Sequence, residues 1–165
     1  MKENKMNNAI FSPDRKYRYI LIRSWANQHP SVMFIGLNPS TADETTDDNT
    51  IRRCTVFAVK WGYQELVMAN LYAFRSTDPK ILKMVWDPAG PQNETYILGY
   101  AKTVELIILC WGSNAPKHRS EYYIRLLSKD FLEKLAVLEY TKDHLPKHPL
   151  YLKGDLKPIM LNEMK

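Results

Sequence analysis

The sequence predicts a single three-layer α/β/α domain in which helices cover both faces of a mainly parallel sheet. Short apolar runs typical of strands alternate along the chain with segments whose apolar residues recur at helical spacing. Strands joined in this way pair in parallel, and right-handed crossovers layer the helices on the sheet. No linker-like or low-complexity stretch divides the 165 residues. We therefore expect one domain over 1–165, with its core at about 11–152.

The first half of the chain is expected to alternate strands with one helix. Tyr17 to Arg23 alternates aromatic, aliphatic and basic residues, which suits a strand near a sheet edge that opens the domain. The apolar run from Ser31 to Ile35 predicts the first buried strand. The segment from Thr50 to Trp61 predicts a helix that ends at Gly62, and Glu65 to Leu71 predicts the next strand.

The second half continues the alternation and ends in a tail, 153–165, to which we assign no element. Its strand at 105–110 is apolar throughout, which indicates burial on both faces. The expected elements are a short helix over 78–85, a helix from the turn at 87–91 to about 103, the strand over 105–110, a helix over 119–134 and a final strand over 136–140.

Charge favours a nucleic-acid partner without requiring one. The chain has a net charge of +5 and a pI near 9.1, and small basic proteins without such a partner are common. The polar residues 1–8 lack the apolar stretch of a signal peptide, and no run is long enough to cross a bilayer. We expect a cytoplasmic protein with DNA or a nucleotide as partner and no membrane contact.

Cysteine and histidine usage predicts no metal and no cofactor. Cys54 and Cys110 occur in a chain without an export signal, so reduced core thiols are expected rather than a disulfide. Two cysteines cannot complete a structural zinc or iron-sulfur site, and the four histidines lie outside any ligand-like spacing.

Polar residues follow four of the predicted strands, where open α/β folds bind ligands. Asn38 stands after the first buried strand, in Ile35-Gly36-Leu37-Asn38-Pro39-Ser40. Asn70, Gly112-Ser113 and His148 follow later strands in the same way. Each residue alone also fits a structural role as a turn former or cap. Together they predict one site along one edge of the sheet.

These segments resemble motifs of the uracil-DNA glycosylase superfamily, in the same order. Gly36-Leu37-Asn38-Pro39 resembles its first motif in the form of the mismatch-specific branch. The segment 61–70 resembles the one that leads into the base-reading asparagine, and 109–113 resembles the glycine-serine phosphate loop. His148-Pro149 resembles the start of the last motif. The resemblance implies the fold of that superfamily.

A closer resemblance covers Phe11 to Leu152. Over this range the chain is similar to the bacterial and phage family known as domain of unknown function 1643. The residues that carry the similarity are Arg18-Tyr19, the run from Asn38 to Asp43, Thr50-Ile51-Arg52-Arg53 and His148-Pro149-Leu150-Tyr151.

The glycosylase resemblance implies hydrolysis of the N-glycosidic bond of an unusual or modified base in DNA. Such a site needs a positioned water and donors aimed at the departing base. Ser40 stands where the fast uracil enzymes carry a bulky tyrosine, so a roomier pocket is expected. The implied roles are Asn38 and His148 in catalysis, Asn70, Gly36 and Ser40 in base binding, and Gly112, Ser113 and Lys117 in binding a DNA phosphate.

The first motif of the chain matches the glycosylase pattern but lacks a carboxylate, and the last motif departs from that pattern. Asn38 carries an amide, which can orient a water but cannot act as a strong general base. Asp43, in the acidic loop 43–48, could supply the carboxylate, although that loop also suits capping of the helix that follows. The last motif reads His-Pro-Leu-Tyr and lacks a phosphate-binding hydroxyl, so Leu150 or Tyr151 could instead fill the gap of a flipped base.

Two other functions stay open because of these departures. One is a module that binds a modified or damaged base in nucleic acid without catalysis. The other is an enzyme that acts on free nucleotides or nucleosides, for which residues that grip DNA are unnecessary. DNA binding would fall steeply with salt, whereas binding of a mononucleotide would not.

Overall fold

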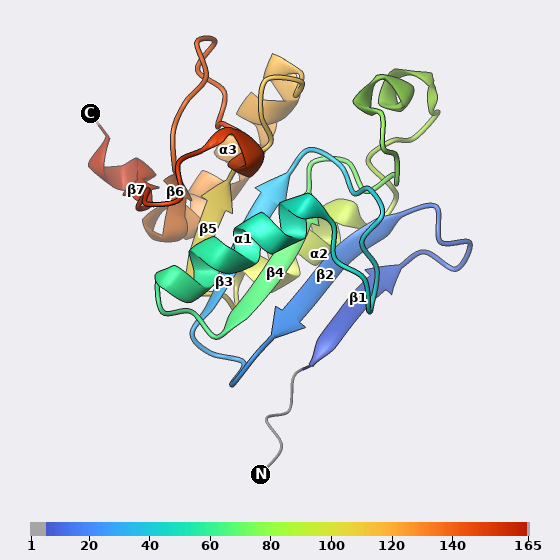
Figure 1. The fold of residues 1–165 in the computed structure, drawn as a ribbon. Coiled ribbons are helices and arrows are strands. Elements are labelled where there is room, and N and C mark those ends of the chain that lie inside the picture. Colours follow the sequence, from blue (N-terminus) through green and yellow to red (C-terminus); the bar gives the residue numbers. More distant parts are fainter. Residues whose placement is uncertain (1–5, 165) are drawn as a thin grey trace.

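A computed structural model describes residues 6–164, and within them the chain forms a seven-stranded mixed sheet (Figure 1). The strands are β1 (Asn7–Phe11), β2 (Arg18–Ser24), β3 (Ser31–Gly36), β4 (Glu65–Asn70), β5 (Leu106–Leu109), β6 (Leu135–Val137) and β7 (Ile159–Met160). They lie in the order β1-β2-β4-β3-β5-β6-β7. Residues 1–5 of the polar N-terminus, on which the expectation of no signal peptide partly rests, and residue 165 lie outside the described range.

Three α-helices and four short 3-10 helices accompany the strands within residues 6–164. The α-helices are α1 (Asn49–Lys60), α2 (Asn93–Ala101) and α3 (Lys117–Phe131). The 3-10 helices are η1 (Pro79–Met84), η2 (Leu132–Lys134), η3 (Pro149–Tyr151) and η4 (Leu161–Glu163). In the part of the chain that the structure describes, no helix has the length and apolar character needed to span a membrane.

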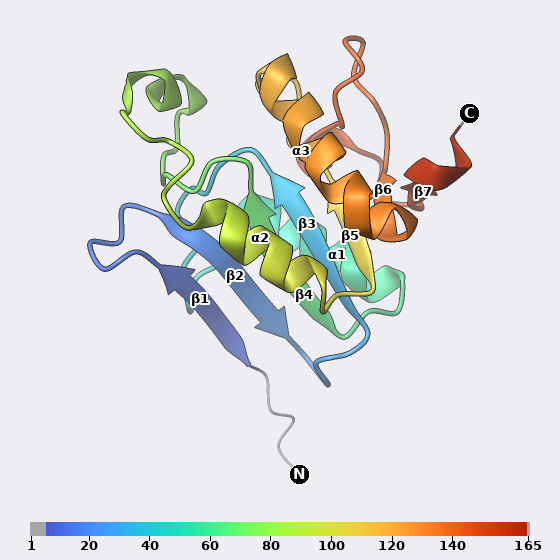
Figure 2. The ribbon, with the colours of Figure 1, turned by 180° about the vertical axis from the view of Figure 1, so that it is seen from behind.

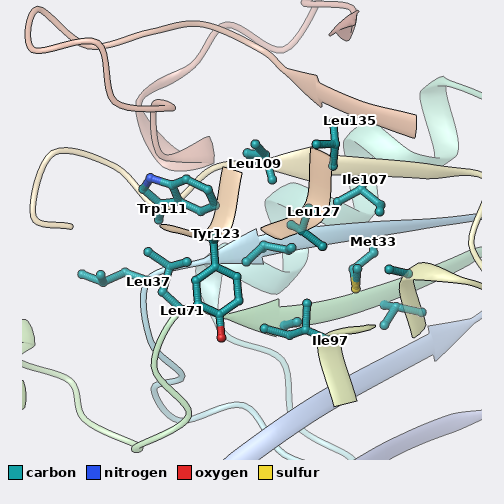
Figure 3. Packing of buried hydrophobic residues seen from close by; sticks show 14 of the residues in the cluster. Met33, Leu37, Leu71, Ile97, Ile107, Leu109, Trp111, Tyr123, Leu127 and Leu135 are labelled. Atoms are coloured by element: carbon teal, nitrogen blue, oxygen red, sulfur yellow. The ribbon is translucent and has the colours of Figure 1, made fainter. Parts of the chain in front are cut away.

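Helices cover both faces of the sheet, as the sequence predicts. α1 lies on one face (Figure 1), and α2 and α3 lie on the other (Figure 2). Alternation along β3 divides its side chains between two cores: Val32 and Phe34 join the core under α1, and Met33 and Ile35 join the core under α2 and α3. Figure 3 shows Tyr123 of α3 among residues of the second core.

The prediction of a mainly parallel sheet is wrong at its edges. The central strands β4, β3, β5 and β6 pair in parallel, whereas β1, β2 and β7 pair antiparallel to their neighbours. β1 opens the described chain and forms one edge, so the predicted opening strand, β2, is an inner strand. The sequence signal for β1 and β7 is weak because neither contains a fully buried residue, and β7 is only two residues long.

Boundaries of the later elements also differ from the prediction. α3 begins and ends earlier than expected, since the chain after Phe131 tightens into η2. β6 consequently starts at Leu135 and is only three residues long. Cys54 and Cys110 are buried free thiols, which confirms their prediction as reduced core residues.

The connections place the carboxyl ends of the central strands next to a change of direction in the sheet. The chain leaves β3 and returns through α1 to β4 on one side, then crosses through α2 to β5 on the other side of β3. Ligands in open α/β folds bind outside the strand ends at such a switch point. β2 runs antiparallel to β4, so its first residue, Arg18, lies at the end of the sheet where the parallel strands have their carboxyl ends.

Candidate functional site

A cavity of about 410 Å³ lies at the carboxyl ends of β3, β4 and β5. Sites for small molecules commonly measure about 300–1,000 Å³. All four strand-end segments singled out in the sequence contribute to its wall. The predicted site residues that line it are Gly36, Asn38, Ser40, Asn70, Gly112, Ser113 and His148.

The Asn38 side chain is fixed so that its oxygen is the group left for a ligand. Its Nδ2 donates to the backbone oxygens of Pro39 (3.1 Å) and Ser76 (2.8 Å). Two carbonyl acceptors require the amide nitrogen at that position, so the orientation of the amide follows from its partners. Oδ1 remains as an acceptor that can orient a water or a ligand donor.

Asn70 presents a buried amide without a partner at the same wall. It pairs with Gly36 across the last register position of β4 and β3 and is 2 % exposed. Its Nδ2 has no hydrogen-bond partner among the described residues. A Cβ added to Gly36 would lie 2.9 Å from Asn70 Oδ1, so the glycine makes room for the amide. A buried donor of this kind is costly unless a ligand or water accepts from it.

His148 is held in the tautomer that carries its proton on Nε2. Its Nδ1 accepts a hydrogen bond of 3.2 Å from the backbone N–H of Leu150. Burial lowers the pKa of His148 from its ordinary value, while the nearby charge of Asp48 opposes that shift. A neutral imidazole with an Nε2 donor follows near neutral pH.

Gly112 allows the His148 loop to approach β5. Its φ is 85°, and its N–H donates to Pro146 at 2.7 Å. A Cβ at this position would lie 3.1 Å from His148 Cβ, which is tighter than ordinary packing. From the other side, Arg53 of α1 donates to the backbone oxygens of Pro149 and Leu152. The loop is therefore fastened to both β5 and α1.

Arg18 is a residue of the cavity wall that the sequence reasoning did not assign to the site. It is 2 % exposed, and its Nη1 donates to Ala42 O at 3.0 Å, but its Nε has no partner among the described residues. Desolvation lowers the pKa of Arg18 to about 10, which still leaves it charged, and Asp48 counters part of that effect. The sequence marks Arg18 only through the Arg18-Tyr19 pair of the family resemblance. A basic residue in an alternating strand pattern is too common to indicate a site.

Asp48 supplies the carboxylate of the cavity wall. Its Oδ1 accepts from Ile51 N at 2.9 Å, so Asp48 is the N-cap of α1, the role that the sequence suggests for the acidic loop. Its charge acts on both Arg18 and His148. The sequence could not separate Asp48 from its acidic neighbours, because only the start of the helix decides which of them faces the strand ends.

The structure does not bring Asp43 or Lys117 to the cavity. Asp43 Oδ1 accepts from the backbone N–H groups of Thr45 (3.0 Å) and Thr46 (2.9 Å), and these bonds lower the pKa of Asp43. Its carboxylate stabilises the turn of the acidic loop, and these hydrogen bonds make it a weaker base. Lys117 is an exposed residue at the first position of α3.

Two arginines pair with the other acidic residues of the loop, Glu44 and Asp47. This pairing reduces the repulsion between the loop and a DNA phosphate at the proposed site. Asp47 pairs with the buried Arg23 at 2.8 Å, and Glu44 forms a two-point pair with Arg15 at 2.7 and 2.9 Å. These contacts fix the path of the loop between β3 and α1.

Comparison with known proteins yields one family. The family model described as "Protein of unknown function (DUF1643)" matches residues 18–150, a range that contains every residue of the cavity wall except Tyr151. No curated protein and no solved structure matches the chain. The comparisons add no support to the glycosylase resemblance, which rests on the motifs themselves.

Proposed function

The chain belongs to the family described as "Protein of unknown function (DUF1643)", and we propose that its cavity binds a nucleobase of DNA and hydrolyses the N-glycosidic bond. The observation that carries the proposal is Asn70, a residue of the cavity wall whose buried Nδ2 has no hydrogen-bond partner among the described residues. An acceptor on a ligand would recover a penalty of about 1–3 kcal/mol for that donor. The edge of a pyrimidine offers such an acceptor beside a donor for the asparagine oxygen.

The order of the cavity residues supports the same architecture as the uracil-DNA glycosylases. Gly36-Leu37-Asn38-Pro39, Asn70, Gly112-Ser113 and His148 occur in the order of the motifs that they resemble. All of them line one cavity of a size suited to a nucleobase and its sugar. In this proposal Ser40 leaves room for a substituted base.

The proposed reaction uses Asn38 and Asp48 on the water. Asn38 Oδ1 orients the water, whose oxygen attacks C1′ of the sugar, and the proton of the water passes to the carboxylate of Asp48. The bond between C1′ and the base nitrogen breaks, and its electron pair leaves with the base. Asp48 supplies the basicity that an amide lacks.

Two donors of the cavity wall would stabilise the departing base. His148 Nε2–H and the charged guanidinium of Arg18, whose Nε is unpartnered among the described residues, both belong to the cavity wall. In the proposed reaction they donate to the base oxygen on which negative charge develops. The base then takes a proton from solvent.

Base release from DNA tests this function. We would incubate the protein with strands that contain uracil, mismatched or hypermodified pyrimidines, and measure free base together with alkali-sensitive abasic sites. Asn38→Ala and His148→Ala should fold and lose product by at least about tenfold. The exposed Lys102→Gln, at the end of α2, serves as control and should release base like the parent. Undiminished product in the Asn38 and His148 variants would refute the assignment.

A base-binding module without catalysis is the second candidate. One observation favours it: Oδ1 of Asp48 already accepts from Ile51 N, so this oxygen is engaged in capping α1. In that case the same oligonucleotides bind through the cavity and no base is released. An enzyme for free nucleotides would instead bind mononucleotides with little dependence on salt.

A further inference from the structure

A projecting segment stands beside the cavity; we call residues 75–88 the finger. Figures 1 and 2 both show it extending beyond the edge of the sheet, with η1 at its end. Its base is fastened by backbone hydrogen bonds, from Phe74 N to Pro88 O (3.1 Å) and from Arg75 N to Lys16 O (2.9 Å). Ser76, Thr77 and Pro79 of the finger form part of the cavity wall. The finger is thus an extension of the site.

The end of the finger exposes large apolar side chains. Trp86 is 100 % exposed and Met84 is 84 % exposed, whereas Leu82 is the buried residue of η1. An indole left fully in water gains nothing for folding, because no apolar surface is removed from solvent. A tryptophan on a fixed projection therefore indicates a surface that contacts a partner.

A shallow basic hollow lies at the base of the finger, lined by Arg15, Lys16, Ser40, Thr41, Phe74, Arg75, Ser76 and Thr77. It shares Ser40, Ser76 and Thr77 with the cavity, so the two spaces adjoin. The hollow therefore extends the binding surface from the cavity toward the β1–β2 side of the sheet.

Two of the three cations of the hollow contact an aromatic ring, and the charge of the hollow is only partly neutralised. The guanidinium groups of Arg15 and Arg75 lie 3.8 and 4.8 Å from the centre of the Phe11 ring. Arg15 is paired with Glu44, but Lys16 and Arg75 form no ion pair with a carboxylate within residues 6–164. Two available cations beside a nucleobase cavity provide the charge complementary to a phosphate.

We propose that the basic hollow and the finger bind a nucleic-acid strand whose target base enters the cavity. A backbone phosphate lies against Lys16 and Arg75, and a base next to the target stacks on Trp86. Aromatic stacking combined with cations along the backbone is the physical basis of binding to single strands. The inference rests on the proposed function and narrows its substrate to a polynucleotide.

Binding of a fluorescent single-stranded oligonucleotide, followed by anisotropy over a series of salt concentrations, tests the proposal. Trp86→Ala should weaken binding by about fivefold or more, and Trp86→Phe should retain most of it. The double variant Lys16→Gln/Arg75→Gln should weaken binding and reduce the salt slope by roughly 1 to 1.5. Oligonucleotide should also quench a part of the tryptophan fluorescence that is missing in Trp86→Phe.

A matched control separates these effects from a general loss of charge. Lys102→Gln/Lys129→Gln removes two exposed cations near the C-terminal ends of α2 and α3, away from the cavity wall, and should change neither affinity nor slope by as much. Oligonucleotide binding that is equal in the parent, the Trp86→Ala variant and the Lys16/Arg75 variant overturns the proposal. If those variants still release base and lose this activity when Asn70 is also substituted, the proposed function stands without the further inference. A parent protein that binds no oligonucleotide overturns both the proposed function and the further inference.

Discussion

Asn70 and Gly36 show how one residue type prepares the place for another. The missing Cβ of Gly36 leaves space for Asn70 Oδ1, and the amide then lies at the cavity wall with its nitrogen unpaired among the described residues. An unpaired buried donor weakens folding by about 1–3 kcal/mol and is retained where a ligand uses it. The glycine at the end of β3 thus permits the position of the Asn70 side chain at the end of β4, which we propose binds the nucleobase.

Gly36→Ala is expected to destabilise the protein by about 1–3 kcal/mol, because the new methyl group would meet Asn70 Oδ1 and Met68 Cε at 2.9 Å. Gly99→Ala is the matched control: apart from its chain neighbours and the backbone of its own helix, no atom lies within 4 Å of its added Cβ, and the position is inside α2. That variant should gain about 0.5–1 kcal/mol. Urea unfolding of both measures the difference, and equal stability of Gly36→Ala and the parent would contradict the packing.

His148 makes stability depend on pH with a definite sign. Burial lowers its native pKa below the ordinary value of 6.5, so between the two values the unfolded chain binds more protons. Its contribution to stability is full above pH 6.5 and is lost as the pH falls to the native pKa. His148→Gln should flatten the unfolding free energy over that window. An unchanged slope in the variant would show that His148 titrates as in the unfolded chain.

At the scale of elements, α1 links the acidic loop to the site. Its N-cap, Asp48, both satisfies a backbone N–H of the first turn and faces the cavity. Arg53 of the same helix donates to the backbone of the His148 loop. One helix therefore positions both the proposed general base, Asp48, and the loop of the proposed hydrogen-bond donor, His148.

Substitution of Asp48 separates its two roles. Asp48→Asn keeps an oxygen for Ile51 N and loses the charge, whereas Asp48→Ala also loses the cap, at about 1 kcal/mol. We expect stability to fall in the order parent, Asn, Ala, and base release to fall in both variants. Asn49→Ala, the exposed neighbour, should release base normally. Base release by Asp48→Asn at the parental rate would exclude the carboxylate from the reaction.

The central strands and α1 were predictable because continuous apolar runs are typical of buried strands and helically spaced apolar residues are typical of an amphipathic helix. Gly36, Asn38, Asn70 and His148 were predicted for the same site because parallel strand ends share one edge. β1 and β7 were missed because neither contains a fully buried residue that would mark a strand in the sequence, although β1 pairs with its chain neighbour β2. The positions of Arg18 and Asp48 at the cavity could not be predicted from the sequence, because they depend on the direction of β2 and on the residue at which α1 begins.

The whole molecule places groups of different chemistry around one edge of the sheet. The cavity opens at the switch point beside β3, the finger and basic hollow adjoin it through Ser40, Ser76 and Thr77, and Ser113 belongs to its wall. The net charge of +5 agrees with a polyanionic partner, and the cations of the hollow give that charge a location. The account requires that a base occupy the cavity against Asn70.

Titration of the 15N-labelled protein with free pyrimidine bases, followed through side-chain amide resonances by NMR, tests this requirement most directly. Uracil, thymine and 5-hydroxymethyluracil would be compared, with Asn70→Ala used to assign the resonance. The account predicts that at least one base shifts the Asn70 Nδ2 resonances saturably, because the unpartnered donor gains an acceptor. Saturable binding that leaves Asn70 unmoved, or no binding of any pyrimidine, would contradict it.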